Sequence, residues 1–316
     1  MATYIARRIL LAVPVMIGVT LVVFLMMRLA PGDVALLMVG PRYTPEALAE
    51  ARARLGLDQP LPAQYLIWLW HAVQGDLGRS IRQGEEVRTL VVDRFQNSFI
   101  LGATAFVLTA IVGIGVGVLT AVKRGSLLDR VVVFLSMLGV STPAFFLGMI
   151  LIVVFADKIP ILPSGGMHDI EGSKGPLDVA RHLILPAITL AAPSSTVVAR
   201  VVRSSMLEVI GQDFVRTAQA KGLPSSAVIG RHVLKNALIP VINLLGLQAG
   251  FLLAGSAIVE VVFSYPGIGN LTIKSISDRD LPVTQGCVLA IALVYVLINI
   301  GADLIQGLLD PRISVR

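Results

Sequence analysis

The sequence predicts an all-α membrane protein with six transmembrane helices and a small helical domain outside the membrane. Apolar residues make up 55% of its 316 residues, charged residues make up only 15%, and the mean hydropathy is +0.81. Soluble domains carry about a quarter charged residues, so the excess of apolar side chains has to face lipid. Six runs are long enough for membrane-crossing helices, each of which takes about 20 apolar residues.

We place the spans where charged residues are rare. The first follows Arg7 and Arg8, is longer than the core of a signal peptide and lacks a small-residue cleavage site, which predicts a retained anchor. The second and third contain no charge before Asp157. The six predicted spans cover residues 9–27, 99–122, 131–156, 183–199, 237–259 and 283–302.

These spans divide the chain into three predicted parts. Residues 1–30 form the N-terminus and the first span, and residues 31–98 form the external helical domain. Residues 99–316 form a membrane core that contains spans two to six. Within this core, the loop 200–235 joins spans four and five.

The external domain carries the signals of two helices. Thr44 as N-cap, followed by a proline and an acid, predicts a helix that ends at Gly56. A second helix is predicted to begin near Pro62, with an apolar stripe flanked by tryptophans that favours contact with the outer membrane surface. The stripe and its flanks consist of Leu66, Trp68, Leu69, Trp70 and Val73.

The basic residues orient the chain. Thirteen Lys and Arg residues fall on the N-terminus, the loop after span two, the 200–235 loop and the C-terminal tail, against five in the short loops of the opposite side. Basic short loops stay in the cytoplasm, which predicts that both termini and the 200–235 loop are cytoplasmic. The net charge of +6 follows from this asymmetry and requires no nucleic acid as a partner.

The 200–235 loop is basic and amphipathic, and it predicts a helix, a glycine break and a second helix. Residues 205–208 fit a capping box that would start the first helix, and Gly222 after a lysine is typical of its end. Ser225 or Ser226 can cap the second helix, which leads into span five. The predicted apolar stripe of the first helix consists of Met206, Ile210, Phe214 and Ala218.

Two interpretations of this loop stay open. A helix, a tight break and a second helix that continues into a span would form a rigid lever, so that force on the first helix reaches span five. Alternatively, the first helix lies flat on the anionic inner leaflet. Within the spans, Gly113 and Gly117 form a small-xxx-small pair, which predicts a close helix contact.

Several chemistries are disfavoured. No stretch reads Gly-x-x-x-x-Gly-Lys-Ser/Thr, so this chain has no phosphate-binding loop of that type. Ion-coupled transporters usually place ionisable residues in the middle of the membrane. Arg28 and Asp303 lie at span edges instead, which argues against proton or sodium coupling. The single cysteine, Cys287, excludes an internal disulfide. The histidines lack metal-ligand spacing and are predicted to be solvated, with no metal bound: His71, His168, His182 and His232.

Residues 216–223 read Arg-Thr-Ala-Gln-Ala-Lys-Gly-Leu, and residues 231–240 read Arg-His-Val-Leu-Lys-Asn-Ala-Leu-Ile-Pro. These segments resemble the coupling loop of bacterial ABC-importer permeases, in the dipeptide/oligopeptide group and its first permease subunit. The general motif, Glu-Ala-Ala-x3-Gly-x9-Ile-x-Leu-Pro, fits only at Ala218, Gly222 and Leu234, whereas the peptide-importer version tolerates these changes. Further matches in the same order lie at 31–33, 55–58, 64–65, 75–78, 121–126, 203–209, 263–269 and 310–312.

The resemblance implies the type I ABC-importer permease fold and a non-catalytic translocation subunit in a bacterial inner membrane, carrying short peptides inward. It implies no cofactor in this chain, two separate ATPases that bind ATP and Mg, an extracytoplasmic substrate-binding protein and a second permease, which is a paralogue or, as the alternative, a second copy of this chain. The residues implied to contact the ATPases are Phe214, Arg216, Thr217, Ala218, Lys221, Gly222, Leu223 and His232.

Polar residues of the spans are candidates for the translocation pathway, because a peptide needs hydrogen-bond partners in passage, although helical Ser and Thr often bond to their own backbone. These candidates are Ser141, Thr142, Ser194, Ser195, Asn243 and Gln248. Alternative functions are the same machine carrying nickel or glutathione, or a secondary transporter or channel that works alone.

Overall fold

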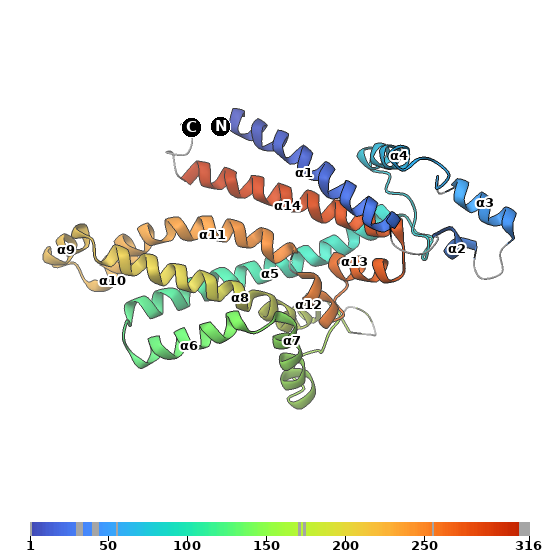
Figure 1. Ribbon diagram of the computed structural model, residues 1–316. Coiled ribbons are helices and arrows are strands. Elements are labelled where there is room, and N and C mark those ends of the chain that lie inside the picture. Colours follow the sequence, from blue (N-terminus) through green and yellow to red (C-terminus); the bar gives the residue numbers. More distant parts are fainter. Residues whose placement is uncertain are drawn as a thin grey trace. The chain divides into compact units, whose positions relative to one another are not determined.

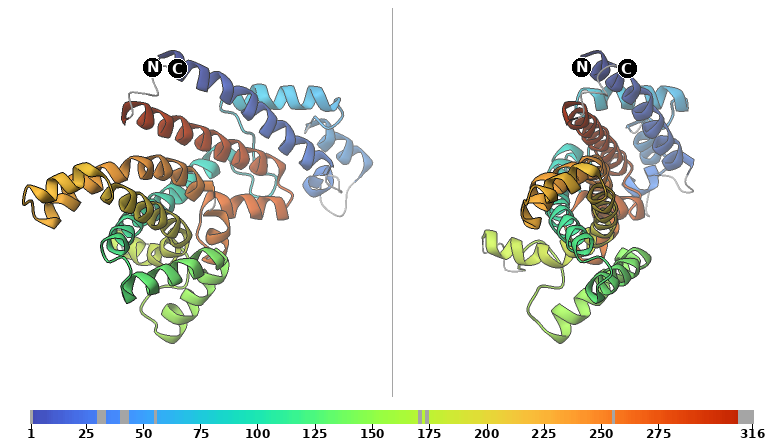
Figure 2. Two further views of the ribbon diagram at one scale, coloured as in Figure 1. Left: turned by 60° about the vertical axis from the view of Figure 1, so that its left-hand side comes forward. Right: turned by 90° about the vertical axis from the view of Figure 1, so that its left-hand side faces the viewer.

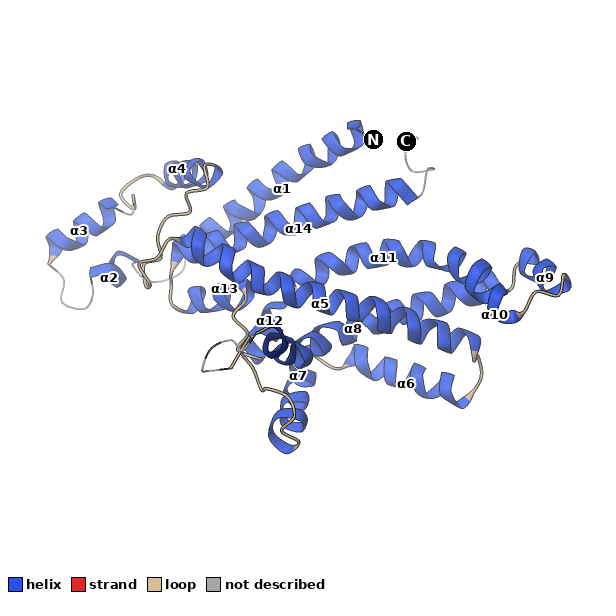
Figure 3. Cartoon of the chain, turned by 180° about the vertical axis from the view of Figure 1, so that it is seen from behind, coloured by secondary structure: helices blue, strands red, loops and turns tan. Residues whose placement is uncertain are grey.

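Helices make up the regular structure of the described part of the chain. The computed structural model describes residues 2–29, 34–39, 44–54, 56–169, 172, 175–254 and 256–309. Across these ranges, Figure 3 shows helices joined by loops, and the β-type pairing is an isolated bridge between Arg79 and Glu86. The predicted all-α class is therefore confirmed.

The helices are labelled in chain order in Figure 1. Two π-helical segments, η1 and η2, interrupt the α-helical series. The bounds are α1 Ala2–Leu29, α2 Val34–Val39, α3 Pro45–Arg54, α4 Leu61–Val73, α5 Val87–Val122, α6 Leu127–Ser141, α7 Ala144–Ile152, η1 Val153–Lys158, α8 Pro176–Ile210, α9 Asp213–Ala220, α10 Ser225–Ala227, η2 Val228–Val233, α11 Leu234–Ala254, α12 Ser256–Val262, α13 Ile268–Ser277 and α14 Leu281–Leu309.

The chain forms two compact units. Unit 1 comprises Met1–Ser98 and Pro266–Leu297, and unit 2 comprises Phe99–Tyr265 and Ile298–Arg316. The division of the chain into parts at residues 30 and 98 stays a prediction.

Most predicted spans coincide with long apolar helices. By length and composition, four described stretches can cross a membrane, and they contain all or most of predicted spans two, four, five and six. The first predicted span lies in α1, whose apolar stretch Leu10–Met26 is shorter. The four stretches are Val87–Val122, Pro176–Ile210, Ser225–Leu252 and Leu281–Ala302.

Predicted spans three and five differ from the structure. In place of one helix over 131–156, α6 and α7 are separated at Thr142 and Pro143, and the stretches Leu127–Gly139 and Ala144–Lys158 are bent by 105°. Proline causes this break because it lacks an N–H donor and clashes with the preceding turn. Counted as one broken span, the pair would be a fifth. The region predicted as span five holds two helices, α11 and α12.

Unit 2 is built around α8 and α11, and α5 packs closely on α8. A Cβ atom added at Gly117 would lie 2.5 Å from Cβ of Val202 and 2.7 Å from the carbonyl oxygen of Ala199. At Gly113 it would lie 2.7 Å from Cβ of Val198. The two glycines therefore let the backbones approach, as the small-xxx-small pair predicts.

In unit 1, α4 packs on α1. The Tyr65 hydroxyl forms a hydrogen bond with Oγ1 of Thr20 at 2.9 Å and lies 3.3 Å from the Ile17 carbonyl oxygen. The predicted caps of α3 are confirmed, since the Ala47 amide donates to Oγ1 of Thr44 and Gly56 has φ +62.

The loop before α5 is fixed to the start of α14 within unit 1. Asp280 accepts hydrogen bonds from the Ser80 hydroxyl and from the Ile81 and Arg82 amides. Cys287 is fully buried in a core cluster with Val87, where it packs as a small apolar residue.

Candidate functional site in the loop between α8 and α11

The first helix of the loop begins later than predicted. The proposed capping box at 205–208 is wrong, because α8 continues through it to Ile210 and α9 starts at Asp213. The Gly211 amide bonds back to the Glu208 carbonyl oxygen and closes α8. The break turns α9 relative to the predicted stripe, so Phe214 is 40% exposed.

The buried face of α9 consists instead of Val215 and Ala218, which are 2% and 9% exposed. They belong to one core cluster with Met206 of α8 and with Val228 and Val233 of η2. Since this apolar face is covered by the protein itself, it is not available to a lipid leaflet. The burial favours the lever over a helix lying flat on the membrane.

Gly222 makes the predicted turn after α9. It has φ +79, its amide bonds to the Gln219 carbonyl oxygen, and the Leu223 amide bonds to that of Ala218. This left-handed end is the pattern for which glycine is preferred. The predicted cap by Ser225 or Ser226 is wrong, because Pro224 holds the N-cap position and no side chain caps the helix.

The second helix then runs without a break into the membrane. The elements α10, η2 and α11 form one continuous stretch, Ser225–Leu252, that is long and apolar enough to cross a bilayer. Figures 1 and 2 show α9 at the end shared by α8 and α11. A displacement of α9 would therefore act directly on α8 and α11, the two long helices of unit 2 that it joins.

We define the docking surface as those of the eight predicted contact residues that are exposed. Two apolar side chains, Phe214 and Leu223, are about 40% exposed, at 40% and 42%. Arg216 forms a 3.5 Å ion pair with Asp213, and both side chains are largely exposed. Of the eight predicted contact residues, Ala218 is buried and seven are exposed: Phe214, Arg216, Thr217, Lys221, Gly222, Leu223 and His232. Exposed apolar side chains together with cationic side chains on one loop suit a protein partner.

An ion pair that sequence reasoning missed joins α8 to the start of α6. Nε and an Nη of Arg203 donate to the two carboxylate oxygens of Asp129 at 3.1 and 3.0 Å. The Gly125 amide also donates to Asp129, and Ser126 caps α6 through the Asp129 amide. The spacing of Ser126 and Asp129 fits the capping pattern and could have indicated this helix start.

The candidate pathway residues do not gather at one site in the structure. The Ser194 hydroxyl lies 3.4 Å from Oε1 of Gln248, which joins α8 and α11. Thr142 donates to the Leu138 carbonyl oxygen of its own helix, and Asn243 is exposed. The side chain of Ser141 lies outside the described residues.

Ser195 faces a different space, a groove between α5, α6 and α8. Two adjoining cavities of about 530 and 400 Å³ form this groove, and both are lined by Ser136 and Thr196. Arg200 and Arg203 line the larger one. Sequence reasoning did not select Ser136 or Thr196, because single hydroxyls in apolar helices carry no spacing signal.

Two buried ionisable residues depart from the expectations. His182 is only 4% exposed and its Nδ1 lies 3.0 Å from the Asp178 carbonyl oxygen, so its predicted solvation is wrong, whereas His71, His168 and His232 are exposed. Glu260 of α12 is fully buried and accepts a hydrogen bond from Ser256 at 2.7 Å. It follows directly after predicted span five and was overlooked for that reason.

Sequence and structure comparisons give consistent matches. Residues 113–315 match the family described as binding-protein-dependent transport system inner membrane component, and residues 1–102 match the N-terminal region described for such components. The dipeptide transport system permease protein DppB of Escherichia coli strain K12 is 42% identical over 335 residues, covering 99% of each chain. The di/tripeptide transport system permease protein of Pseudomonas aeruginosa strain UCBPP-PA14 is 43% identical over 332 residues, covering 99% of each chain.

Two further matches complete the comparison. The glutathione transport system permease protein GsiC of Salmonella choleraesuis strain SC-B67 is 39% identical over 316 residues and all of each chain. Among solved structures, the MetNI methionine ABC transporter in an inward-facing conformation matches with a TM-score of 0.57 and 19% identity. That match covers 70% of this chain and 96% of the other, and at this identity it concerns the fold.

Proposed function

Because this chain belongs to the family of binding-protein-dependent transport system inner membrane components, we propose that it is the translocation subunit of an ATP-driven importer for short peptides. The predicted fold of an ABC-importer permease is confirmed, and the chain is a multi-pass inner membrane protein. Relatives named for dipeptides and di/tripeptides, aligned over 99% of the chain, support peptides as the cargo.

The proposed coupling between the ATPase and the membrane helices rests on the continuity of the loop with those helices. A partner ATPase binds the docking surface, with Phe214 and Leu223 as apolar anchors. Movement of α9 is transmitted through Val215 and Ala218 into the core shared by α8, η2 and α11. Close-packed interiors transmit such displacements because they have few voids to absorb them.

The partners follow from this role. We propose that two ATPases bind ATP and Mg on the cytoplasmic side, and that this chain binds neither. A second, paralogous permease completes the translocation unit, and an extracytoplasmic protein delivers the substrate. The distribution of basic residues supports cytoplasmic termini and a cytoplasmic docking surface.

Glutathione is the second candidate cargo. The glutathione permease of Salmonella aligns over all of this chain at 39% identity, only slightly below the dipeptide relatives. Competition for uptake into vesicles that contain the reconstituted transporter distinguishes the two cargoes. Uptake of a labelled substrate that glutathione blocks and dipeptides leave unchanged would assign glutathione.

The docking surface gives the most direct test of the function. A tagged chain is expected to retain its ATPase during purification. The double variant Phe214→Ala, Leu223→Ala should lower this retention about tenfold or more, because apolar side chains that become buried at an interface contribute most of its binding energy. Ser226→Ala, at an exposed position of the same loop outside the docking surface, is the matched control.

Equal retention of the ATPase by the double variant and the control would remove the docking surface from the mechanism. Substrate uptake by vesicles that contain this chain alone, without ATP, would overturn the whole proposal and favour an autonomous transporter.

A further inference from the structure

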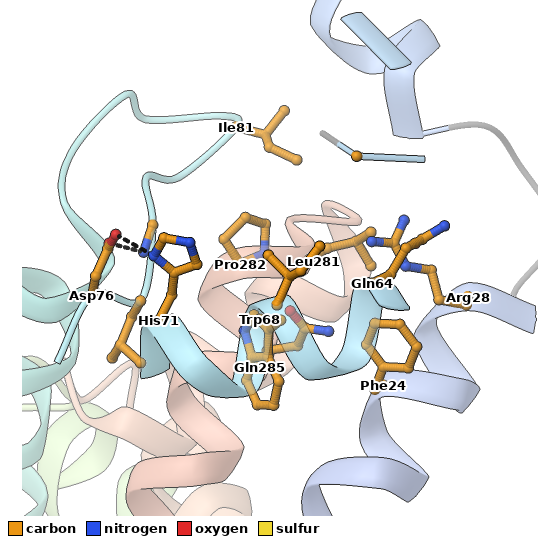
Figure 4. Close-up of a pocket in the computed structure, with 14 residues that line it drawn as sticks. Phe24, Arg28, Gln64, Trp68, His71, Asp76, Ile81, Leu281, Pro282 and Gln285 are labelled. Atoms are coloured by element: carbon orange, nitrogen blue, oxygen red, sulfur yellow. Dashed lines mark hydrogen bonds and ion pairs between the residues drawn. The ribbon is translucent and has the colours of Figure 1, made fainter. Parts of the chain in front are cut away.

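A cavity in unit 1 is lined by three residues that carry unpartnered polar atoms. Its volume is about 290 Å³, and α1, α4 and the start of α14 contribute to its walls (Figure 4). Within the described chain, three buried side-chain atoms have no hydrogen-bond partner: Nε of Arg28, Oε1 of Gln64 and Nε1 of Trp68. All three residues line this cavity. Buried polar atoms of native proteins nearly always have a hydrogen-bond partner, so each of these three atoms requires one.

The donor and acceptor roles of these atoms are defined. Gln64 is 9% exposed, and its Nε2 donates to the Gln59 and Leu57 carbonyl oxygens at 2.7 and 3.4 Å. Its Oε1 is therefore an unused acceptor. Arg28 and Trp68 each offer an unused N–H donor. The cavity thus matches a ligand with an oxyanion for the two donors and an N–H or O–H group for the amide oxygen.

The depth of the cavity identifies the source of such a ligand. The bonds of Tyr65 to Thr20 and Ile17 place α4 beside the apolar stretch Leu10–Met26. Arg28 lies two residues beyond that stretch, about 3 Å further along the helix axis. This is the level of a membrane interface, where lipid phosphates, tryptophan and arginine meet.

The mouth of the cavity supports a lipid over a free ion. Ile67 lines the cavity and is 53% exposed, and its neighbour Leu66 on α4 is 63% exposed. Exposed apolar side chains at membrane depth provide contacts for acyl chains next to the polar cavity. A soluble phosphate would gain nothing from them.

We propose that this cavity binds the headgroup of a membrane phospholipid. Arg28 and Trp68 donate to the phosphate oxygens, and Oε1 of Gln64 accepts from the headgroup. Ethanolamine and glycerol headgroups carry N–H or O–H donors, whereas the quaternary ammonium of choline carries none. The cavity therefore selects phosphatidylethanolamine or phosphatidylglycerol over phosphatidylcholine.

The two tryptophans of the chain make a matched pair for the test, since they are Trp68 and Trp70. In full-length protein purified in detergent, Trp70→Phe leaves Trp68 as the only tryptophan of the chain. Titration with short-chain phosphatidylethanolamine should then shift the Trp68 emission saturably. The apparent Kd should be about fivefold or more below that for phosphatidylcholine, which is the effect of one hydrogen bond.

Trp68→Phe keeps an aromatic side chain and removes the N–H donor. By native mass spectrometry it should bind phosphatidylethanolamine about tenfold or more weakly than Trp70→Phe, because the lost bond is to a charged group.

Three results would overturn the assignment. Equal affinity for choline and ethanolamine lipids removes the role of Gln64, and equal lipid binding by the two tryptophan variants removes that of Trp68. A saturable shift with inorganic phosphate alone would identify a free-anion site instead.

Discussion

The contact between α5 and α8 permits a sharp test, because two glycines of α5 two residues apart differ in their surroundings. Gly117 faces α8, where an added Cβ would lie 2.5 Å from Cβ of Val202 and 2.7 Å from the carbonyl oxygen of Ala199. Gly115 has nothing within 4 Å of such an atom. The variants Gly117→Ala and Gly115→Ala therefore add the same methyl group to the same helix, once into a contact and once into open space.

The magnitude follows from two terms. Replacing glycine by alanine in a helix favours folding by up to about 1 kcal/mol, and this term is common to both variants. Overpacking a close contact costs about 1–3 kcal/mol, and here the oxygen of Ala199 belongs to the backbone and cannot rotate away. Gly117→Ala should thus be less stable than Gly115→Ala by about 1–3 kcal/mol. For a chain of 316 residues this difference corresponds to roughly 2–4 °C in apparent Tm.

The assay is thermal unfolding of both purified variants and the unchanged chain at one scan rate, because membrane proteins often unfold irreversibly. Gly115→Ala is expected at or slightly above the unchanged chain. If the two variants unfold at the same temperature, the α5–α8 contact is not as close as the structure shows, and the small-xxx-small interpretation fails.

Three further predictions concern the loop, the ion pair and unit 1. Gly222→Ala should lower the free energy of unfolding by about 1 kcal/mol because φ is +79. Gly230→Ala, whose added Cβ meets nothing within 4 Å and whose φ is not positive, should not destabilise the chain, and thermal unfolding compares the two variants. In Gly222→Pro, ATP hydrolysis that continues without uptake would support the lever. Asp129→Arg and Arg203→Asp should each impair uptake, and the double exchange should restore part of it; no restoration would show that the pair acts separately. Tyr65→Phe removes the hydrogen bond to Thr20 and should lower stability by about 0.5–1.5 kcal/mol, and an unchanged unfolding temperature would contradict that contact.

Patterns with a fixed local cause could be predicted from the sequence. The end of α9 at Gly222 and the cap at Thr44 depend on residues within one turn, and both are confirmed. The same local reasoning failed at 205–208, where Ser205 fits a capping box but lies inside α8. There the packing of Met206 into the core of unit 2 keeps the helix continuous, and a tertiary contact overrides the local signal.

Contacts between distant segments could not be predicted in this way. Sequence reasoning selected Ser194 and Gln248 as polar groups but gave no reason to pair them across α8 and α11. It treated His182 as solvated, because nothing in its spacing shows that Asp178 and the first turns of α8 enclose it. The unpartnered atom of Trp68 was equally hidden, since the sequence shows an interfacial tryptophan but not a cavity beside it.

Three contacts of unit 2 near the docking surface involve the same stretch of α8. Val202 meets Gly117 of α5, Arg203 binds Asp129 of α6, and Met206 packs with Val215 of α9. These α8 residues lie within two turns, so α9 cannot move as a rigid body without loading α5 and α6 through the same segment. Since α11 shares this core, the proposed lever would act on the bundle as a whole rather than on span five alone. A motion confined to α11 would withdraw Ala237 and Val241 from the core that they share with Met206 and Val215, which exposes apolar surface at a cost of about 25 cal/mol per Å².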